Sequence, residues 1–309
     1  NGVTEQNTPD GTYTKTTKTA DPLFGMQSPL IATEVKAPSD HTHLKMTTTR
    51  TVNLSDQGNP LSLVSETIKT ILNGKTTTTN FTAATKQYDS TSPAGRLTKT
   101  TIDNQERMTN AEISGVETIN YSYDPRGRLA SIAQGSGENQ RTSTFSYNDK
   151  GFLEKVTDPL NRTQQFTYDQ AGRVTQQTLP DSRVINWTYD ANGNVTSVTP
   201  PGKPKHEFTY TSINLESLYT PPSVAGIADP MTHYEYNLDK QLTKIIRPDG
   251  QEITSTYDGS GRLDRVTIPG KTITYGYNAQ GKIETMNTSE GVNLRLTYVG
   301  FLPFSQFWT

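Results

Sequence analysis

A period of about 21 residues runs through most of the chain and constrains its fold more than any other feature. The stretch from Phe166 to Arg173 reads aromatic, threonine, tyrosine, aspartate, two further residues, glycine and arginine, and the next copy is centred on Tyr189. Units of this length bury their apolar faces only against neighbouring units. The sequence therefore predicts a repeat protein.

Each unit predicts two short antiparallel strands joined by tight turns. Phe166 and Tyr168 lie two residues apart, so in an extended chain both rings lie on one face of a sheet. Asp169 then accepts backbone N–H groups in a turn, and Gly172 supplies a position with positive φ. The residues from 173 to 178 are rich in β-branched side chains and predict the second strand. The expected fold class is all-β, built from antiparallel β-hairpin repeats of about 21 residues.

The repeated positions are the tyrosine at the end of the first strand, the aspartate after it and the glycine of the turn. We expect structural roles for all of them. They are Tyr123, Asp124, Gly127, Tyr147, Gly151, Tyr168, Asp169, Gly172, Tyr189, Asp190, Gly193, Tyr236, Tyr257, Asp258, Gly261, Tyr277 and Gly281.

The chain divides by composition into two parts. Residues 1–50 are rich in threonine and lysine and predict lead-in strands, whereas residues 51–309 predict the repeat array. The next clear copy after Tyr210 is at Tyr236, 26 residues on, which predicts a longer loop at about 211–233. The last unit, at Tyr298, is followed by no polar capping element, so we expect the array to be truncated at its C-terminus.

Composition excludes several classes of function. Hydrophobic residues make up 31% of the chain, which is low for a conventional filled core and fits a wall one sheet thick. The net charge of −2 does not favour nucleic acid as a partner. No stretch approaches 18 apolar residues, so we expect no membrane-spanning helix. Cysteine is absent, which excludes disulfides and thiolate metal sites.

The repeated side chains are compatible with binding as well as with folding. The aspartates are possible calcium ligands, but each stands where a turn needs an acceptor, and the glycine-dense repeats of calcium solenoids are absent. The aromatic residues are a possible stacking platform for sugars or nucleic acid, although period-two aromatics more often pack a sheet. The basic residues after the turns are expected to pair with aspartates of adjacent units. They are Arg128, Arg173, Arg262 and Lys282.

No pattern of residues predicts catalysis or a cofactor. His41 and His43 have strand spacing and share a face, but two ligands without cysteine make a poor metal site, so we expect no metal. The chain has neither a nucleophile elbow nor a phosphate-binding glycine loop.

The in-phase copies of Tyr-Asp-x-x-Gly-Arg-Leu, as at Tyr257 to Leu263, resemble the YD repeats of the Rhs family. That family occurs in bacterial polymorphic toxins and insecticidal toxin complexes, with relatives in animal teneurins. The resemblance covers roughly residues 50–309. It implies a long β ribbon that curves or spirals into a hollow shell enclosing a toxin. The self-cleaving aspartates of bacterial family members have no counterpart here, so no protease activity is expected.

Two functions remain at this stage. The resemblance favours a non-catalytic segment of a shell that encapsulates a toxin polypeptide, with the cargo or the remaining shell repeats as partners, in a secreted or cell-surface bacterial protein. The alternative is a cell-surface adhesin or carbohydrate-binding stalk that uses exposed aromatic residues and the loop from Tyr219 to Pro230.

Overall fold

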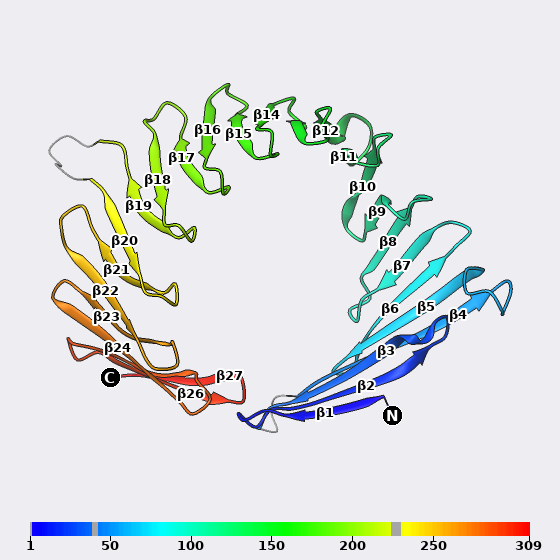
Figure 1. Ribbon diagram of the computed structural model, residues 1–309. Helices are drawn as coiled ribbons and strands as arrows, with labels where there is room; N and C mark the ends of the chain where they lie inside the picture. The colour runs from blue at the N-terminus through cyan, green and yellow to red at the C-terminus, as the bar shows by residue number, and fades with distance from the viewer. Residues whose placement is uncertain (1, 39–42, 224–229) are drawn as a thin grey trace. The chain divides into compact units, whose positions relative to one another are not determined.

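The computed structural model describes residues 2–38, 43–223 and 230–309, and these residues form an almost purely β structure. Apart from one short 3-10 helix, η1 (Gly137–Asn139), the regular elements are strands that pair antiparallel with their neighbours in the chain (Figure 1). The predicted all-β fold of antiparallel hairpin repeats is confirmed.

The strands fall into two compact units, one of residues 1–145 with 298–302 and one of residues 146–297 with 303–309. The strands up to residue 147 are β1 (Val3–Asn7), β2 (Tyr13–Asp21), β3 (Gly25–Lys36), β4 (His43–Leu54), β5 (Leu63–Leu72), β6 (Lys75–Thr82), β7 (Gln87–Thr91), β8 (Leu97–Ile102), β9 (Met108–Ile113), β10 (Val116–Tyr123), β11 (Leu129–Gln134) and β12 (Arg141–Tyr147).

The remaining strands are shorter and more regular. They are β13 (Leu153–Thr157), β14 (Thr163–Tyr168), β15 (Val174–Thr178), β16 (Val184–Tyr189), β17 (Val195–Thr199), β18 (His206–Tyr210), β19 (Glu216–Thr220), β20 (Thr232–Tyr236), β21 (Leu242–Ile246), β22 (Glu252–Tyr257), β23 (Leu263–Ile268), β24 (Lys271–Tyr277), β25 (Ile283–Thr288), β26 (Asn293–Val299) and β27 (Leu302–Trp308). Of the loop expected at about 211–233, residues 216–220 form β19, residues 232 and 233 begin β20, and residues 224–229 lie outside the described residues.

The two faces of the strands differ in burial, but few side chains are fully buried. In β14, Phe166 and Tyr168 are half-buried, whereas Thr167 between them is exposed, as the period of two predicts. Among the described hydrophobic residues, only Ala37 and Ala111 are fully buried. The described part of the chain has no filled core, so strand pairing and half-buried side chains stabilise it.

A buried ion cluster joins three of the long strands in the first unit. Arg50 on β4 contacts Asp21 at the end of β2, with 3.1 Å between Nη1 and Oδ2, and its Nε donates to Glu66 on β5 at 2.6 Å. The Asp21 and Glu66 side chains are only 3% and 8% exposed. Burial alone raises the pKa of Asp21, but donation from two backbone N–H groups and from Arg50 keeps that pKa below its usual value.

A bulge recurs beside the repeated tyrosines. Thr167 lies opposite Gln176, but Tyr168 lies opposite Val174, which leaves Thr175 as an extra residue in β15. The same shift occurs one residue before Tyr189, Tyr210 and Tyr257. The side chain of the extra residue bonds across the hairpin, as in the 3.1 Å contact between the hydroxyls of Thr167 and Thr175. A bulge re-aims the side chains next to it, and this one lies next to the turn in each of these hairpins.

Candidate functional site

The turn after each repeated tyrosine is built around the carboxylate of its aspartate. Oδ1 of Asp169 accepts the backbone N–H groups of Ala171 and Arg173, both at 2.9 Å, and Oδ2 accepts from Nε of Arg173 at 2.6 Å. The backbone closes the turn through Asp169 N–H to Arg173 O at 2.9 Å. Gly172 adopts φ of +82°, a conformation that a residue with a Cβ enters only at a cost.

Other turns share this geometry. In each of them, Oδ1 of an aspartate or asparagine accepts the backbone N–H of the residue four positions later. Asparagine replaces aspartate in three turns, and its Oδ1 accepts the same backbone N–H groups. The turns begin at Asp103, Asp124, Asn148, Asp158, Asp169, Asp190, Asn237, Asp258 and Asn278. The turn at Asp158 lies at the opposite end of its hairpin, and sequence reasoning missed it although Arg162 follows at the characteristic spacing.

Hydrogen bonding lowers the pKa of these aspartates. For Asp124 and Asp258 the largest cause is the arginine side chain four residues on, and for Asp169 it is the backbone N–H of Arg173. A carboxylate that accepts several hydrogen bonds is stabilised in its charged form. The aspartates therefore act as charged acceptors that hold the turn.

The expected pairing of the arginines with aspartates of adjacent units is wrong. Arg128, Arg173 and Arg262 each form an ion pair with the aspartate of their own turn, at 2.6 to 2.7 Å. The reason is local geometry, because the turn brings residues four apart side by side and the guanidinium matches the carboxylate plane. The fourth basic residue, Lys282, follows Asn278 and has no aspartate in its turn.

Arg173 and Arg262 also reach the next unit by a different contact. The Arg173 guanidinium lies 4.6 Å from the centre of the Tyr189 ring, and its Nη1 donates to the backbone oxygen of Asp190 at 3.0 Å. Arg262 lies 4.4 Å from the Tyr277 ring in the same way. A guanidinium over an aromatic face is attracted by the ring quadrupole. One side chain therefore closes its own turn and contacts the next.

The tyrosine hydroxyls join successive units. Each donates at 2.6 to 2.9 Å to the backbone oxygen of the first residue of the second strand in the preceding hairpin. The donor and acceptor residues are Tyr123 and Met108, Tyr168 and Leu153, Tyr189 and Val174, Tyr210 and Val195, Tyr236 and Glu216, Tyr257 and Leu242, and Tyr277 and Leu263. We call this series the tyrosine ladder. It explains why the position is tyrosine and not phenylalanine, a distinction that hydrophobic patterning alone does not make.

The turn glycines have a second role, because the side chain from the preceding turn lies against them. A Cβ at Gly172 would lie 2.6 Å from Cζ of Phe152, which occupies the arginine position of the preceding turn. The Phe152 ring in turn lies 5.0 Å from the Tyr168 ring, in place of the guanidinium. At Gly193 the corresponding atom is Nη1 of Arg173, at 3.7 Å.

One residue breaks the pattern with a charge. The first position of the second strand is apolar in the other clear units, as at Val195 and Leu242, but is Glu216 in β19. Burial raises the pKa of Glu216. The pKa of the nearby Tyr236 hydroxyl is also raised, mainly by burial and to a smaller extent by the charge of Glu216. Glu216 therefore occupies an environment built for an aliphatic side chain.

The structure places the repeated residues at equivalent points in their hairpins. The tyrosines end their strands, the aspartates begin the turns, and the glycines have φ between 76° and 92°. The tyrosines are Tyr123, Tyr147, Tyr168, Tyr189, Tyr236, Tyr257 and Tyr277, the aspartates are Asp124, Asp169, Asp190 and Asp258, and the glycines are Gly127, Gly151, Gly172, Gly193, Gly261 and Gly281.

Neither a metal centre nor a membrane helix emerges from the described part of the chain. His43 begins β4 and contacts Glu34, with 2.9 Å between Nε2 and Oε1, while His41 lies outside the described residues. Among the described residues, no three histidine, cysteine, aspartate or glutamate side chains gather as metal ligands. Those residues also include no helix of the length and apolarity needed to span a bilayer.

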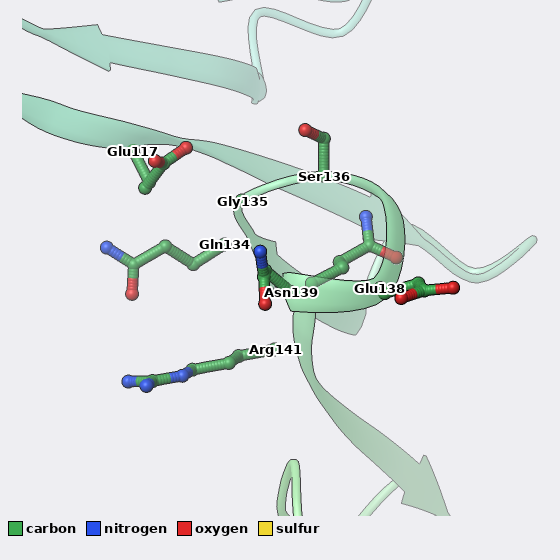
Figure 2. Close-up of a pocket in the computed structure, with 8 residues that line it drawn as sticks. Glu117, Gln134, Gly135, Ser136, Glu138, Asn139 and Arg141 are labelled. Atoms are coloured by element: carbon green, nitrogen blue, oxygen red, sulfur yellow. The ribbon is translucent and has the colours of Figure 1, made fainter.

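A polar recess lies beside the connection between β11 and β12. It has a volume of about 620 Å³ and is lined by Glu117 and by residues 134–136 and 138–141. Figure 2 shows the side chains of Glu117, Gln134 and Arg141 extending to the same side, with Asn139 beside them and Glu138 pointing away. Sequence reasoning did not single out these residues.

Comparison with known proteins agrees with the repeat geometry. A family model described as Teneurin YD-shell matches residues 10–308. No curated protein matches the chain. Similar solved structures include the Photorhabdus luminescens Tc holotoxin pore, at 13% identity and a TM-score of 0.47, and TcdB2-TccC3 without its hypervariable C-terminal region, at 12% identity and a TM-score of 0.47. Each likeness covers 99% of this chain but 20% of the other chain, so this chain spans about a fifth of their length.

Antiparallel hairpins with a repeated tyrosine, turn aspartate and turn glycine define a β-hairpin repeat protein with structural repeat units. Because the family model covers almost the whole sequence, the chain belongs to the Teneurin YD-shell family.

Proposed function

We propose that this chain is a non-catalytic stretch of shell wall that encloses a toxin polypeptide within a secreted or delivered bacterial toxin. Its partners are the enclosed polypeptide and further shell repeats. Family membership supports this proposal at the level of a structural shell segment. The enclosed cargo and the export of the protein are our inference from the YD-repeat pattern.

The observation that carries the proposal is the way each hairpin is joined to the next. The tyrosine ladder and the arginine contacts repeat from unit to unit, whereas hardly any described side chain is fully buried. A chain organised in this way stabilises an extended thin wall without filling an interior. A wall of this kind serves to separate what lies on its two sides.

Thiol accessibility tests the proposal. The chain has no cysteine, so a flexible polypeptide with a single cysteine, fused after Thr309, provides the sole reactive thiol. Encapsulation predicts that maleimide labels this thiol far more slowly than in the same polypeptide alone, and that urea abolishes the difference. Labelling at the rate of the free polypeptide would contradict encapsulation by this chain.

The alternative, a cell-surface adhesin or carbohydrate-binding stalk, would bind through exposed aromatic residues and the loop from Tyr219 to Pro230, and residues 224–229 of that loop lie outside the described residues.

A further inference from the structure

The polar recess exists because one connection in the array is longer than its counterparts. Tyr147 follows Tyr123 after 24 residues, whereas 21 separate Tyr168 from Tyr189. The extra length forms the connection of residues 135–140, which contains η1. Gly135 anchors its start by donating to the backbone oxygen of Thr118 at 2.9 Å. The connection therefore forms one side of an open recess, where a tight turn would leave none.

Three neighbouring strands supply the side chains of the recess. Gln134 on β11 lies directly opposite Arg141 on β12 and opposite Ile119 on β10. Cross-strand partners share a face of the sheet. Glu117 reaches the same side from a shift in register between Val116 and Ile119, where β10 pairs with β9. A bulge of this kind re-aims a side chain.

Three charged residues line the recess, and Glu138 points away from it (Figure 2), which leaves Glu117 and Arg141 as the charged groups beside the open space. Within the described residues, neither Glu117 nor Arg141 makes a hydrogen bond or an ion pair through its side chain, although Arg162 and Arg183 at other turns do. Adjacent strands are about 4.8 Å apart, so the backbones of β10 and β12 are roughly 10 Å apart. Arg50 and Asp21 pair directly across one intervening strand, whereas Glu117 and Arg141 do not, so the space between these two side chains is open to a ligand that bridges them.

We propose that the polar recess binds a compact zwitterion of the size of a di- or tripeptide with free termini. Arg141 binds the ligand carboxylate, because the guanidinium fork matches a carboxylate in two parallel hydrogen bonds. Glu117 accepts from the ligand ammonium. The amides of Gln134 and Asn139 lie between the two charges and match the peptide groups of the ligand.

Size and composition agree with this class of ligand. An extended peptide spans about 3.3 to 3.6 Å per residue, so a di- or tripeptide is comparable in length to the roughly 10 Å between the backbones of β10 and β12. The recess is open to solvent, since six of its eight lining residues are exposed, and its volume of about 620 Å³ is within the range of small-molecule sites. No aromatic side chain lines it, which disfavours ligands that bind by stacking, such as nucleobases.

Titration of the full chain with triglycine at about pH 6, followed by calorimetry and by NMR shifts of the recess residues, tests the site. Binding is expected for triglycine and not for its acetylated and amidated form, which lacks both charges. Replacing either charge, by E117Q or R141Q, is expected to weaken binding about tenfold. The matched controls E154Q and R265Q change exposed strand residues elsewhere and leave binding unaltered. Raising the pH to about 9.5 deprotonates the ligand amine and abolishes binding.

Charge reversal distinguishes this site from a merely polar surface. E117R and R141E each give positions 117 and 141 the same charge and are expected to abolish triglycine binding. The double variant E117R/R141E restores the pair with exchanged positions and is expected to recover binding with the ligand reversed. Equal binding of capped triglycine, equal losses in the control variants, or no recovery in the double variant with its fold retained by circular dichroism would overturn the proposal. Absence of triglycine binding to the folded chain, or binding of a neutral disaccharide in its place, would also overturn it.

Discussion

Two tyrosines on one strand allow the tyrosine ladder to be tested with an internal control. Tyr275 and Tyr277 lie two residues apart on β24, share a face of the sheet and are both half-buried. The Tyr277 hydroxyl donates to the backbone oxygen of Leu263 at 2.8 Å. In the described residues, the Tyr275 hydroxyl makes no hydrogen bond. The two tyrosines therefore differ in the hydrogen bond from the hydroxyl, which is the contact under test.

Replacing Tyr277 by phenylalanine removes the ladder bond and keeps the ring. The Arg262 guanidinium, 4.4 Å from the ring centre, retains its partner. The lost hydrogen bond costs about 1 kcal/mol net, which is about a fivefold change in the equilibrium between closed and open states. The same change at Tyr275 is expected to cost close to nothing.

Native-state hydrogen exchange measures this effect at the right place, because the units of a repeat array open locally. Y277F is expected to speed exchange of the amides of β23, Leu263–Ile268, about fivefold, and Y275F to leave them unchanged. Tyr123 and Tyr121 on β10 offer a second pair, since only Tyr123 has a ladder bond in the described structure. Equal effects of the two substitutions on one strand would refute the assignment of stability to the hydroxyl.

Four further perturbations follow from the geometry. R50M leaves two buried carboxylates without their cation and is expected to destabilise the first unit by about 3 kcal/mol in urea unfolding, whereas a change below about 0.5 kcal/mol would contradict a buried ion cluster. G270A places a side chain in a left-handed backbone position with open space around it and is expected to cost about 1 kcal/mol of stability. G172A is expected to cost more in the same assay, because its Cβ meets the Phe152 ring. Adding F152L to G172A is expected to remove this additional cost. The turn aspartates have lowered pKa values in the folded chain, so their contribution to stability is complete above the unfolded pKa of about 3.9 and is lost as pH falls below it. Unfolding followed by circular dichroism is expected to show constant stability from about pH 7 to 5 and a decline below about pH 4. Glu216 has a raised pKa when folded, so its charge opposes folding above that pKa; E216L is expected to stabilise the chain by about 1 kcal/mol at pH 7, with a smaller gain below about pH 4, where both variants are neutral.

The local features of the repeat were predictable because they depend on residues close together in the chain. Phe166 and Tyr168 share a face because side chains alternate along a strand. The turn at Gly172 follows from the need for positive φ beside an aspartate acceptor. Such rules need no knowledge of neighbouring units.

The contacts between units were not predictable from the same rules. The hydroxyl of Tyr189 bonds to the backbone oxygen of Val174, 15 residues earlier, and that pairing depends on the register set by the recurrent bulge. Arg173 was assigned to a neighbouring aspartate because strand spacing alone places both on one edge, whereas the folded turn brings its own aspartate closer. The polar recess arises from a register shift, which leaves no distinct residue pattern, and from a longer connection, which the spacing of 24 residues between Tyr123 and Tyr147 indicates only as added length.

The proposed function requires this chain to be a segment of thin wall instead of a filled domain. Small-angle X-ray scattering of the full chain in solution tests it most directly. A compact filled protein of this length has a radius of gyration of about 19 Å. The account predicts a clearly larger value together with the oscillating scattering profile of a curved or hollow particle. A radius of gyration near 19 Å with the profile of a solid globule would contradict it.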